Sequence, residues 1–319
     1  LTAEDQVVTV TVPENATMSQ VTDILMEKGL IHYRWLFSLY CMISGAESKI
    51  DPGTYELNAI YDYHALINGM IETAENRANV EVTIPEGFEA DDIFALLEEK
   101  QVCSAAELQE AAANYQFDYD FLKDLDYGDY RRLEGYLFPD TYEFYLNEKP
   151  ASAIKRLLDN FNRKMTEERM QAVEESGYSL KEIITIASLI EKETASASES
   201  PRIAGVIYNR LFHWDYPALL NIDAAIIYAQ DGVSDHIDTS LDSPYNTYLH
   251  VGLTPTPIAN PGLASLQAAL NPESHNYYYY VLNPATGAHQ FSTTQEEHEQ
   301  YRAQFAAAAA AASTQSEGE

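Results

Sequence analysis

The sequence predicts an α+β fold, and three patterns carry this prediction. An internal repeat aligns residues 8–31, VTVTVPENATMSQVTDILMEKGLI, without gaps to residues 80–103, VEVTIPEGFEADDIFALLEEKQVC. Between residues 104 and 196, several segments combine a helix cap with apolar residues at helical spacing. Residues 276–292, NYYYYVLNPATGAHQFS, are typical of a β-hairpin with its turn at Pro284–Gly287. Strands and helices in such separate runs favour an α+β architecture.

Each copy of the repeat predicts a strand followed by a helix. Apolar and polar residues first alternate, as in a half-buried strand, and Pro-Glu then ends the strand because proline has no N–H for the ladder. The helix that follows places three apolar residues on one face. These residues are Val21, Ile24 and Leu25 in the first copy and Ile93, Leu96 and Leu97 in the second.

The first 78 residues resemble a LysM-type glycan-binding module in outline. KIDPGTYELN (49–58) predicts a turn at Asp51–Gly53 that leads into a strand, and DYHALINGMIE (62–72) predicts a helix. With the first repeat copy, the expected order is strand–helix–helix–strand–helix. The likeness rests on this outline and not on diagnostic residues, so a purely structural repeat is the alternative.

Three helices are expected after the second repeat copy. Ser104 caps a helix that carries an acidic residue in its first turn. Residues 150–177 predict one long amphipathic helix, with Pro150 near its start and Gly177 as its stop. Residues 179–196, SLKEIITIASLIEKETAS, predict a helix that begins with a capping box of serine and glutamate.

The charge balance argues against a nucleic-acid partner. The 319 residues include 50 acidic and 19 basic side chains, for a formal net charge of −31. Phosphate binding relies on Lys and Arg, so such a chain repels nucleic acid and anionic lipid surfaces. A solvated surface is the simplest explanation of the acidity.

The two cysteines and the hydrophobic runs predict no metal site and no membrane span. Cys41 and Cys103 have no metal-ligand spacing, and both follow apolar residues, so buried thiols are expected, with one disulfide as the alternative. No run of about 18 apolar residues is present, and no signal peptide is visible.

Helical geometry separates the two glutamates of TIASLIEKETAS. At about 100° per residue, Glu193 falls within the stripe formed by Ile186 and Ile190, whereas Glu191 lies at its edge. Burial against apolar surface raises the pKa of a carboxyl, and a carboxyl protonated near neutral pH is suited to general acid catalysis. The alternative is a simple helix end, with Glu193 bound to loop amides or to Arg202 or Arg210.

Two histidines, His289 and His298, lie in GAHQFSTTQEEHEQY, where they could flank a site. A hairpin histidine and a helix-surface histidine are the simpler interpretation, and we favour it. Glu134 and Asp140 in LEGYLFPDTY are expected to hold a turn rather than to line a cleft.

Five segments together resemble the endolytic murein transglycosylases, the MltG/YceG-like family. They occur in the family's order and spacing, and the resemblance extends from about Val8 to Phe305. The segments are LEGYLFPDTYEF, IASLIEKETA, VIYNRL, DSPYNTYLHVGLTPTPIANPGLASLQAALNP and HQFSTT followed by histidine.

The resemblance implies a bacterial lyase that cuts nascent peptidoglycan glycan strands internally, between MurNAc and GlcNAc, and leaves a 1,6-anhydro end. It implies one glutamate, here Glu193, as acid and then base, because the muramyl 6-hydroxyl serves as the nucleophile. No metal or cofactor is implied. The glycan strand is the expected partner, and peptidoglycan synthases are candidate partners. The resemblance also implies an N-terminal membrane helix, missing from this sequence, and a catalytic part outside the cytoplasm.

The resemblance further implies residues that bind the glycan. The loop YNTY supplies Tyr245, Asn246, Thr247 and Tyr248. Asp223 follows a segment that the family writes with Gln and then Ser or Thr, where this chain has Asn221 and Ile222, so Asp223 is a candidate and Ile222 is not. Glu191 is expected to flank the catalytic residue.

The predicted organisation has four parts. Residues 1–78 form the LysM-like module, residues 79–150 the second repeat and a linker, residues 151–305 a mainly helical catalytic domain with a β-hairpin, and residues 306–319 a disordered tail. Two other functions stay open at this point, a muramidase that uses water and a non-catalytic glycan-binding scaffold of the cell-wall synthesis machinery.

Overall fold

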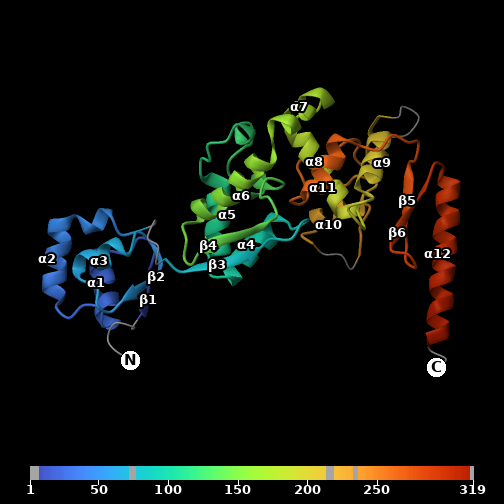
Figure 1. Ribbon diagram of the computed structural model, residues 1–319. Coiled ribbons are helices and arrows are strands. Elements are labelled where there is room, and N and C mark those ends of the chain that lie inside the picture. Colours follow the sequence, from blue (N-terminus) through green and yellow to red (C-terminus); the bar gives the residue numbers. More distant parts are fainter. Residues whose placement is uncertain (1–6, 72–76, 213–218, 233–235, 317–319) are drawn as a thin grey trace. The chain divides into compact units, whose positions relative to one another are not determined.

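The computed structural model describes residues 7–71, 77–212, 219–232 and 236–316. Within them the chain divides into two compact units (Figure 1). The first comprises residues up to Ile84, Asp91–Arg131 and Asp140–Leu157, and the second comprises Pro85–Ala90, Arg132–Pro139 and the chain from Leu158 onward. The α+β prediction is confirmed, since helices alternate with two-stranded antiparallel sheets. The four-part division stays a prediction.

The N-terminal part of the first unit has the predicted order of elements. Strand β1 (Val7–Val12) precedes α1 (Met18–Glu27) and α2 (Arg34–Ser44), and β2 (Gly53–Asn58) precedes α3 (Tyr63–Asn68). The two strands pair antiparallel over a buried core that includes Val10, Leu25, Phe37, Tyr55 and Leu57. A LysM-like identity is not established by this order, so it stays a prediction.

The internal repeat is a repeat of structure. Helix α4 (Ala90–Glu99) begins 72 residues after α1 begins (90 minus 18), and β3 (Asn79–Thr83) begins 72 residues after β1 (79 minus 7). The copies differ in their pairing, since β3 pairs antiparallel with β4 (Thr141–Tyr145). Helix α5 (Ala105–Asn114) begins with the capping box of Ser104 and Glu107.

The long helix expected at 150–177 is wrong, because the structure has two helices there. Helix α6 (Pro150–Lys164) ends before Thr166, whose side chain accepts the N–H of Arg169 and caps α7 (Glu167–Ser176). A side-chain cap satisfies an amide that would otherwise stay unpaired, so it favours a new helix start over a continuous helix. Gly177 ends α7 in a left-handed conformation, as expected.

Thr166→Ala is expected to destabilise this helix start. Loss of an N-cap side chain costs about 1 kcal/mol, and chemical denaturation would measure this decrease in the free energy of unfolding. Thr239→Ala is the matched control, because this loop threonine is exposed and its side chain makes no hydrogen bond within the described residues. An equal effect of both substitutions would contradict the cap assignment.

Helix α8 (Leu180–Glu193) is the centre of the second unit. Every residue from Ile183 to Ile190 is buried, and the predicted capping box of Ser179 and Glu182 is present. It packs against α9 (Ser200–Phe212), α10 (Asp223–Ala229) and α11 (Leu263–Leu270). Because α8 is enclosed by other helices, its C-terminal end is held rigidly in the middle of this unit.

A β-hairpin and a long helix complete the second unit. Strands β5 (Tyr279–Asn283) and β6 (Ala288–Ser292) pair with the turn at the predicted place, and α12 (Gln295–Ser316) packs against both strands. Helix α12 continues through Ser316, and the disordered tail at residues 306–319 stays a prediction. Alanine has the highest intrinsic helix propensity of any residue type, so the alanine run favours a continuous helix.

The buried side chains of Glu134 and Asn260 connect three segments beside α8, which are residues 88–90, residues 134–137 and the loop around residue 260. Glu134 is 1% exposed, and its carboxylate accepts the N–H of Ala90, the Nδ2–H of Asn260 and the hydroxyl of Tyr228. Asn260 is fully buried, and its Oδ1 accepts the N–H groups of Gly135 and Leu137. Glu134 thus has the structural role expected from the sequence.

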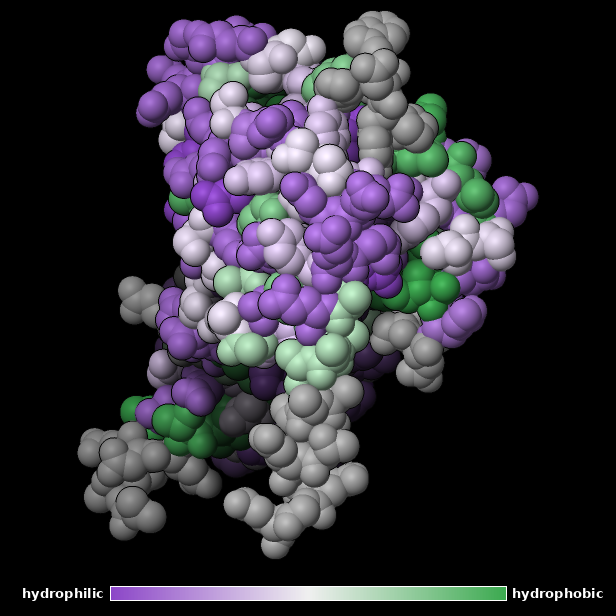
Figure 2. Space-filling view, turned by 90° about the vertical axis from the view of Figure 1, so that its right-hand side faces the viewer, coloured by the Kyte–Doolittle hydropathy of each residue, from purple (hydrophilic) through white to green (hydrophobic). Residues whose placement is uncertain are grey.

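The surface agrees with the acidic composition (Figure 2), and both cysteines are free thiols. The face drawn in Figure 2 is mostly hydrophilic, with hydrophobic residues in separate small groups. Cys41 and Cys103 are free thiols, and the first is buried. Among the described helices, none combines the length and the apolar character needed to cross a membrane.

Candidate active site

The C-terminal end of α8 carries Glu193 into a polar cavity of about 490 Å³. The helix ends at the next residue, Thr194, whose N–H and hydroxyl both donate to the carbonyl of Ile190. The helical projection is confirmed, because Ile186 and Ile190 are fully buried and Glu193 extends from the same side. The cavity is lined by Glu193, Arg210, Asn221, Asp223, Tyr248, Tyr279, Tyr280, Val281, Gln295, His298, Glu299 and Arg302.

The Glu193 carboxyl has one neutral donor and several charged neighbours. The hydroxyl of Tyr280 donates a hydrogen bond to Glu193 Oε2 over 2.7 Å. Burial is the strongest influence and raises the pKa of Glu193, while the Tyr280 hydrogen bond lowers it. Nearby Asp223 raises it, and the charges of Arg210 and His289 lower it. The net effect is a pKa above the ordinary value of a glutamate, as a general acid requires.

Asp223 and Tyr248 form a second carboxyl–phenol pair in the same cavity. The hydroxyl of Tyr248 donates to Asp223 Oδ1 over 2.7 Å. Burial and then this hydrogen bond raise the pKa of Tyr248, so the phenol stays protonated near neutral pH. Asp223 is the first residue of α10, where the helix dipole favours a negative charge. The structure therefore places Glu193, Asp223 and Tyr248 in one cavity, and their catalytic and binding roles stay predictions.

Arg210 is the buried cation of the cavity. It is 7% exposed, its Nε donates to the carbonyl of Tyr278 over 2.7 Å, and its Nη1 donates to the carbonyl of Leu220. Its guanidinium lies 5.5 Å from the centre of the Tyr280 ring. The alternative of a direct Glu193–Arg210 ion pair is therefore not what the structure has, because the guanidinium binds backbone carbonyls.

Glu191 lies outside the cavity lining formed by the described residues. Its Oε2 accepts the N–H of Gly262 over 3.0 Å, and the neighbouring Lys192 pairs with Glu89 at 3.1 Å. A role of Glu191 in substrate binding stays a prediction, and the observed contact fixes the loop before α11.

The YNTY loop divides into one cavity residue and three residues that shape the loop. Asn246 and Thr247 are buried, the first donating to the carbonyls of Thr239 and Leu241 and the second to the carbonyl of Ile222. Tyr245 bonds to the hydroxyl of Thr256 over 2.7 Å. The side chains of these three residues are hydrogen-bonded within the protein, and direct glycan binding by them stays a prediction. We propose that they position Tyr248 and Asp223.

His289 lies in strand β6 of the hairpin, as the simpler interpretation expects, whereas His298 of α12 is more than a helix-surface residue. The His289 side chain is 9% exposed and is held by Glu199, which accepts from its backbone N–H over 2.8 Å and contacts Nδ1 at 3.0 Å. His298 lines the cavity and stacks on Tyr279 at 5.4 Å. Its Nδ1 is buried and, among the described residues, has no hydrogen-bond partner.

Sequence reasoning missed most of the cavity wall from the hairpin and α12. Strand alternation in the run YYYY could not have singled out Tyr280, because the consecutive residues Tyr279, Tyr280 and Val281 all line the cavity. The sequence suggests Arg210 only as an ion-pair partner of Glu193. The α12 residues Gln295, Glu299 and Arg302 gave no sequence pattern that marks them as cavity residues.

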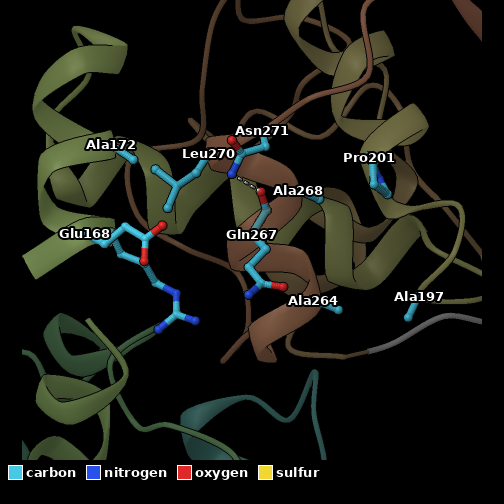
Figure 3. Close-up of a pocket in the computed structure, with 10 residues that line it drawn as sticks. Glu168, Ala172, Ala197, Pro201, Ala264, Gln267, Ala268, Leu270 and Asn271 are labelled. Carbon is cyan, nitrogen blue, oxygen red and sulfur yellow. Dashed lines mark hydrogen bonds between the residues drawn. The ribbon is translucent and has the colours of Figure 1, made fainter. Parts of the chain in front are cut away.

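A second cavity of about 490 Å³ lies among α7, the start of α9 and α11 (Figure 3). Glu168 comes from α7 and Gln267 from α11, and the Nδ2 group of Asn271 donates to the backbone carbonyl of Gln267 over 3.3 Å. None of the predicted site residues lines it. Among the described residues, no group of three or more His, Cys, Asp and Glu side chains is arranged to hold a metal ion.

Comparison with known proteins decides the family. The model of the YceG-like family matches residues 10–304. The chain belongs to the YceG-like family. A protein from Bacillus subtilis named endolytic murein transglycosylase is 29% identical over 313 residues, which is 94% of this chain and 85% of that protein. A protein of the same name from Streptococcus pneumoniae D39 is 30% identical over 322 residues, or 92% of this chain.

The family likeness extends to a solved structure. The chain spans 57% of the length of the Streptococcus pneumoniae relatives. A crystal structure from Listeria monocytogenes, described as a yceG-like protein, is similar with a TM-score of 0.60 and 28% identity. The match covers 93% of the present chain and 99% of the Listeria monocytogenes chain. The two proteins therefore share a fold over nearly their whole length.

Proposed function

We propose that this chain is a peptidoglycan lytic transglycosylase that cleaves glycan strands internally between MurNAc and GlcNAc. One observation carries the proposal, a glutamate with a raised pKa in a polar cavity, on a chain whose curated relatives are named endolytic murein transglycosylases. Glu193 is the proposed catalytic residue.

The proposed reaction needs one proton carrier. Protonated Glu193 gives its proton to the glycosidic oxygen as the bond from that oxygen to the muramyl anomeric carbon breaks. The muramyl 6-hydroxyl oxygen then bonds to the same carbon, and its proton passes to the Glu193 carboxylate. Since the hydroxyl belongs to the sugar being attacked, the step is intramolecular and consumes no water. The Asp223 carboxylate lies in the same cavity, where it would stabilise positive charge that develops on the sugar ring.

The reaction products test the proposal. Purified uncrosslinked glycan strands are incubated with the protein in water labelled with oxygen-18, and the products are weighed by mass spectrometry. We expect 1,6-anhydro-MurNAc ends without the label. Cleavage that leaves labelled reducing ends would contradict the transglycosylase reaction.

A muramidase is the second candidate, and Asp223 is the observation that favours it. Ordinary glycosidases use two carboxyls, one as acid and one as nucleophile or water-activating base. Glu193 and Asp223 share the cavity and could divide these roles. Labelled reducing ends in the same experiment would favour this reaction. A non-catalytic glycan-binding scaffold predicts no cleavage at all.

The raised pKa of Glu193 predicts a pH dependence. The first step requires the protonated carboxyl, so the rate is complete below the pKa of Glu193 and declines as the pH rises through it. Because that pKa lies above the ordinary glutamate value, we expect the decline at a higher pH than for an exposed glutamate. Profiles of kcat/KM against pH would measure it. A decline centred on the ordinary glutamate value would contradict the assignment.

The cellular setting is part of the proposal. Nascent peptidoglycan lies outside the cytoplasm, so a lyase of this kind would act there, next to the membrane on which the strands are made. Peptidoglycan synthases are candidate partners because they produce the proposed substrate.

A further inference from the structure

The Tyr280 hydroxyl occupies one oxygen of the proposed catalytic carboxyl. It donates to Glu193 Oε2 over 2.7 Å, across 87 positions of the sequence. Within the described residues, no hydrogen bond involves Oε1 of Glu193. The two oxygens of the carboxyl are therefore unequal, since one is bound by the protein and the other is left for an external group.

The surrounding structure holds the Tyr280 ring from three sides. Strand register places Tyr280 opposite Phe291 in the β5–β6 hairpin. The ring of His289 meets it edge-on at 5.4 Å, and His289 is itself fixed by Glu199. The Arg210 guanidinium lies 5.5 Å from the ring centre. Because these contacts fix the position of the Tyr280 ring, the Glu193 carboxyl must turn toward the Tyr280 hydroxyl to form the hydrogen bond.

We propose that Tyr280 is a positioning residue, which binds Glu193 Oε2 and so leaves Oε1 as the atom that exchanges the proton with the glycan. This inference rests on the proposed function. Tyr280 keeps its own proton throughout, so the proton moves only between Glu193 and the two sugar oxygens described above.

Removal of the hydroxyl changes both the orientation and the acidity of Glu193. The hydrogen bond stabilises the carboxylate, so its loss in Tyr280→Phe raises the pKa of Glu193 further. The strength of a hydrogen bond to a charged group corresponds to a shift of about one to two pH units. Asp223, Arg210 and His289 act on Glu193 from other elements, and the cavity also holds His298, Glu299 and Arg302, all unchanged in this variant.

The experiment compares pH profiles of wild type, Tyr280→Phe and Tyr277→Phe on uncrosslinked glycan strands. Tyr277 lies three residues earlier and does not line the cavity formed by the described residues, so it is the matched control. For Tyr280→Phe we expect kcat to fall by up to about 100-fold with little change in KM, which is the loss that a misplaced catalytic group can cause. We also expect the descending limb to move up by about one to two pH units.

A second variant keeps the shape of the ring. Incorporation of 3-fluorotyrosine at position 280 makes the hydroxyl a stronger donor, so the descending limb is expected to move to lower pH. The fluorotyrosine variant tests the positioning role of Tyr280 if Tyr280→Phe does not fold. A merely structural role of Tyr280 would lower the amount of active protein without moving the limb in either variant.

The outcomes separate this inference from the proposed function. If the wild type cleaves and both variants have the wild-type limb, the positioning role is overturned and the function stands. If the wild type does not cleave, the proposed function is overturned and the positioning role with it. Opposite shifts in the two variants would support both.

Discussion

Glu193→Gln is expected to reduce glycan cleavage by about a hundred- to ten-thousandfold, which is the range that general acid–base catalysis contributes. Glutamine has nearly the shape of glutamate, and its carbonyl oxygen can still accept the hydrogen bond that Tyr280 donates to Oε2. It cannot release a proton to the glycosidic oxygen. The loss should therefore appear in kcat, with KM close to that of the wild type.

A matched substitution at Glu174 controls for the removal of one negative charge. Glu174 is exposed on α7 and lies outside the cavity, so Glu174→Gln should cleave at the wild-type rate. If Glu193→Gln cleaves as fast as this control, Glu193 is not the proton carrier. If none of the proteins cleaves, the scaffold function gains support.

Local signals made much of the fold predictable. The capping boxes at Ser104 and Ser179 specify helix starts by contacts over three residues, and the structure confirms both. The hairpin turn is equally local. The break at Thr166 was missed because the amphipathic pattern continues across it, and a threonine within such a pattern gives no distinctive mark of a cap.

In the candidate site, too, local signals made some residues predictable and long-range packing hid others. Glu193 could be placed by helical periodicity, since its direction depends on its own helix. Tyr280 and Arg210 could not, because they reach Glu193 and the cavity only through the packing of β5 and α9. Asn246 and Thr247 are polar loop residues that look like ligand contacts in the sequence, and only the folded chain shows their side chains turned inward.

Asn260→Ala is expected to lower the free energy of unfolding by about 4 kcal/mol, since each buried group left without its partner costs about 1–3 kcal/mol. The fully buried Asn260 side chain accepts the N–H groups of Gly135 and Leu137, at 2.9 Å each. It also donates to the carbonyl of Phe88 and, over 2.8 Å, to the carboxylate of Glu134. Alanine leaves the two N–H donors of Gly135 and Leu137 unpaired in the interior, and their effects overlap because the groups are neighbours. The two acceptors keep other donors, since the Phe88 carbonyl still accepts the backbone N–H of residue 260 and the Glu134 carboxylate still accepts from Ala90 and Tyr228.

Asn271→Ala is the control, because this asparagine is exposed at the end of α11 and bonds only to the nearby Gln267 carbonyl among the described residues. Its free energy of unfolding should stay within about 0.5 kcal/mol of the wild type. Denaturant unfolding, with equal m-values checked first, measures both variants. A loss below about 1 kcal/mol in Asn260→Ala would show that water replaces the amide without cost. The three loop segments beside α8 would then be held by their backbones rather than by this side chain.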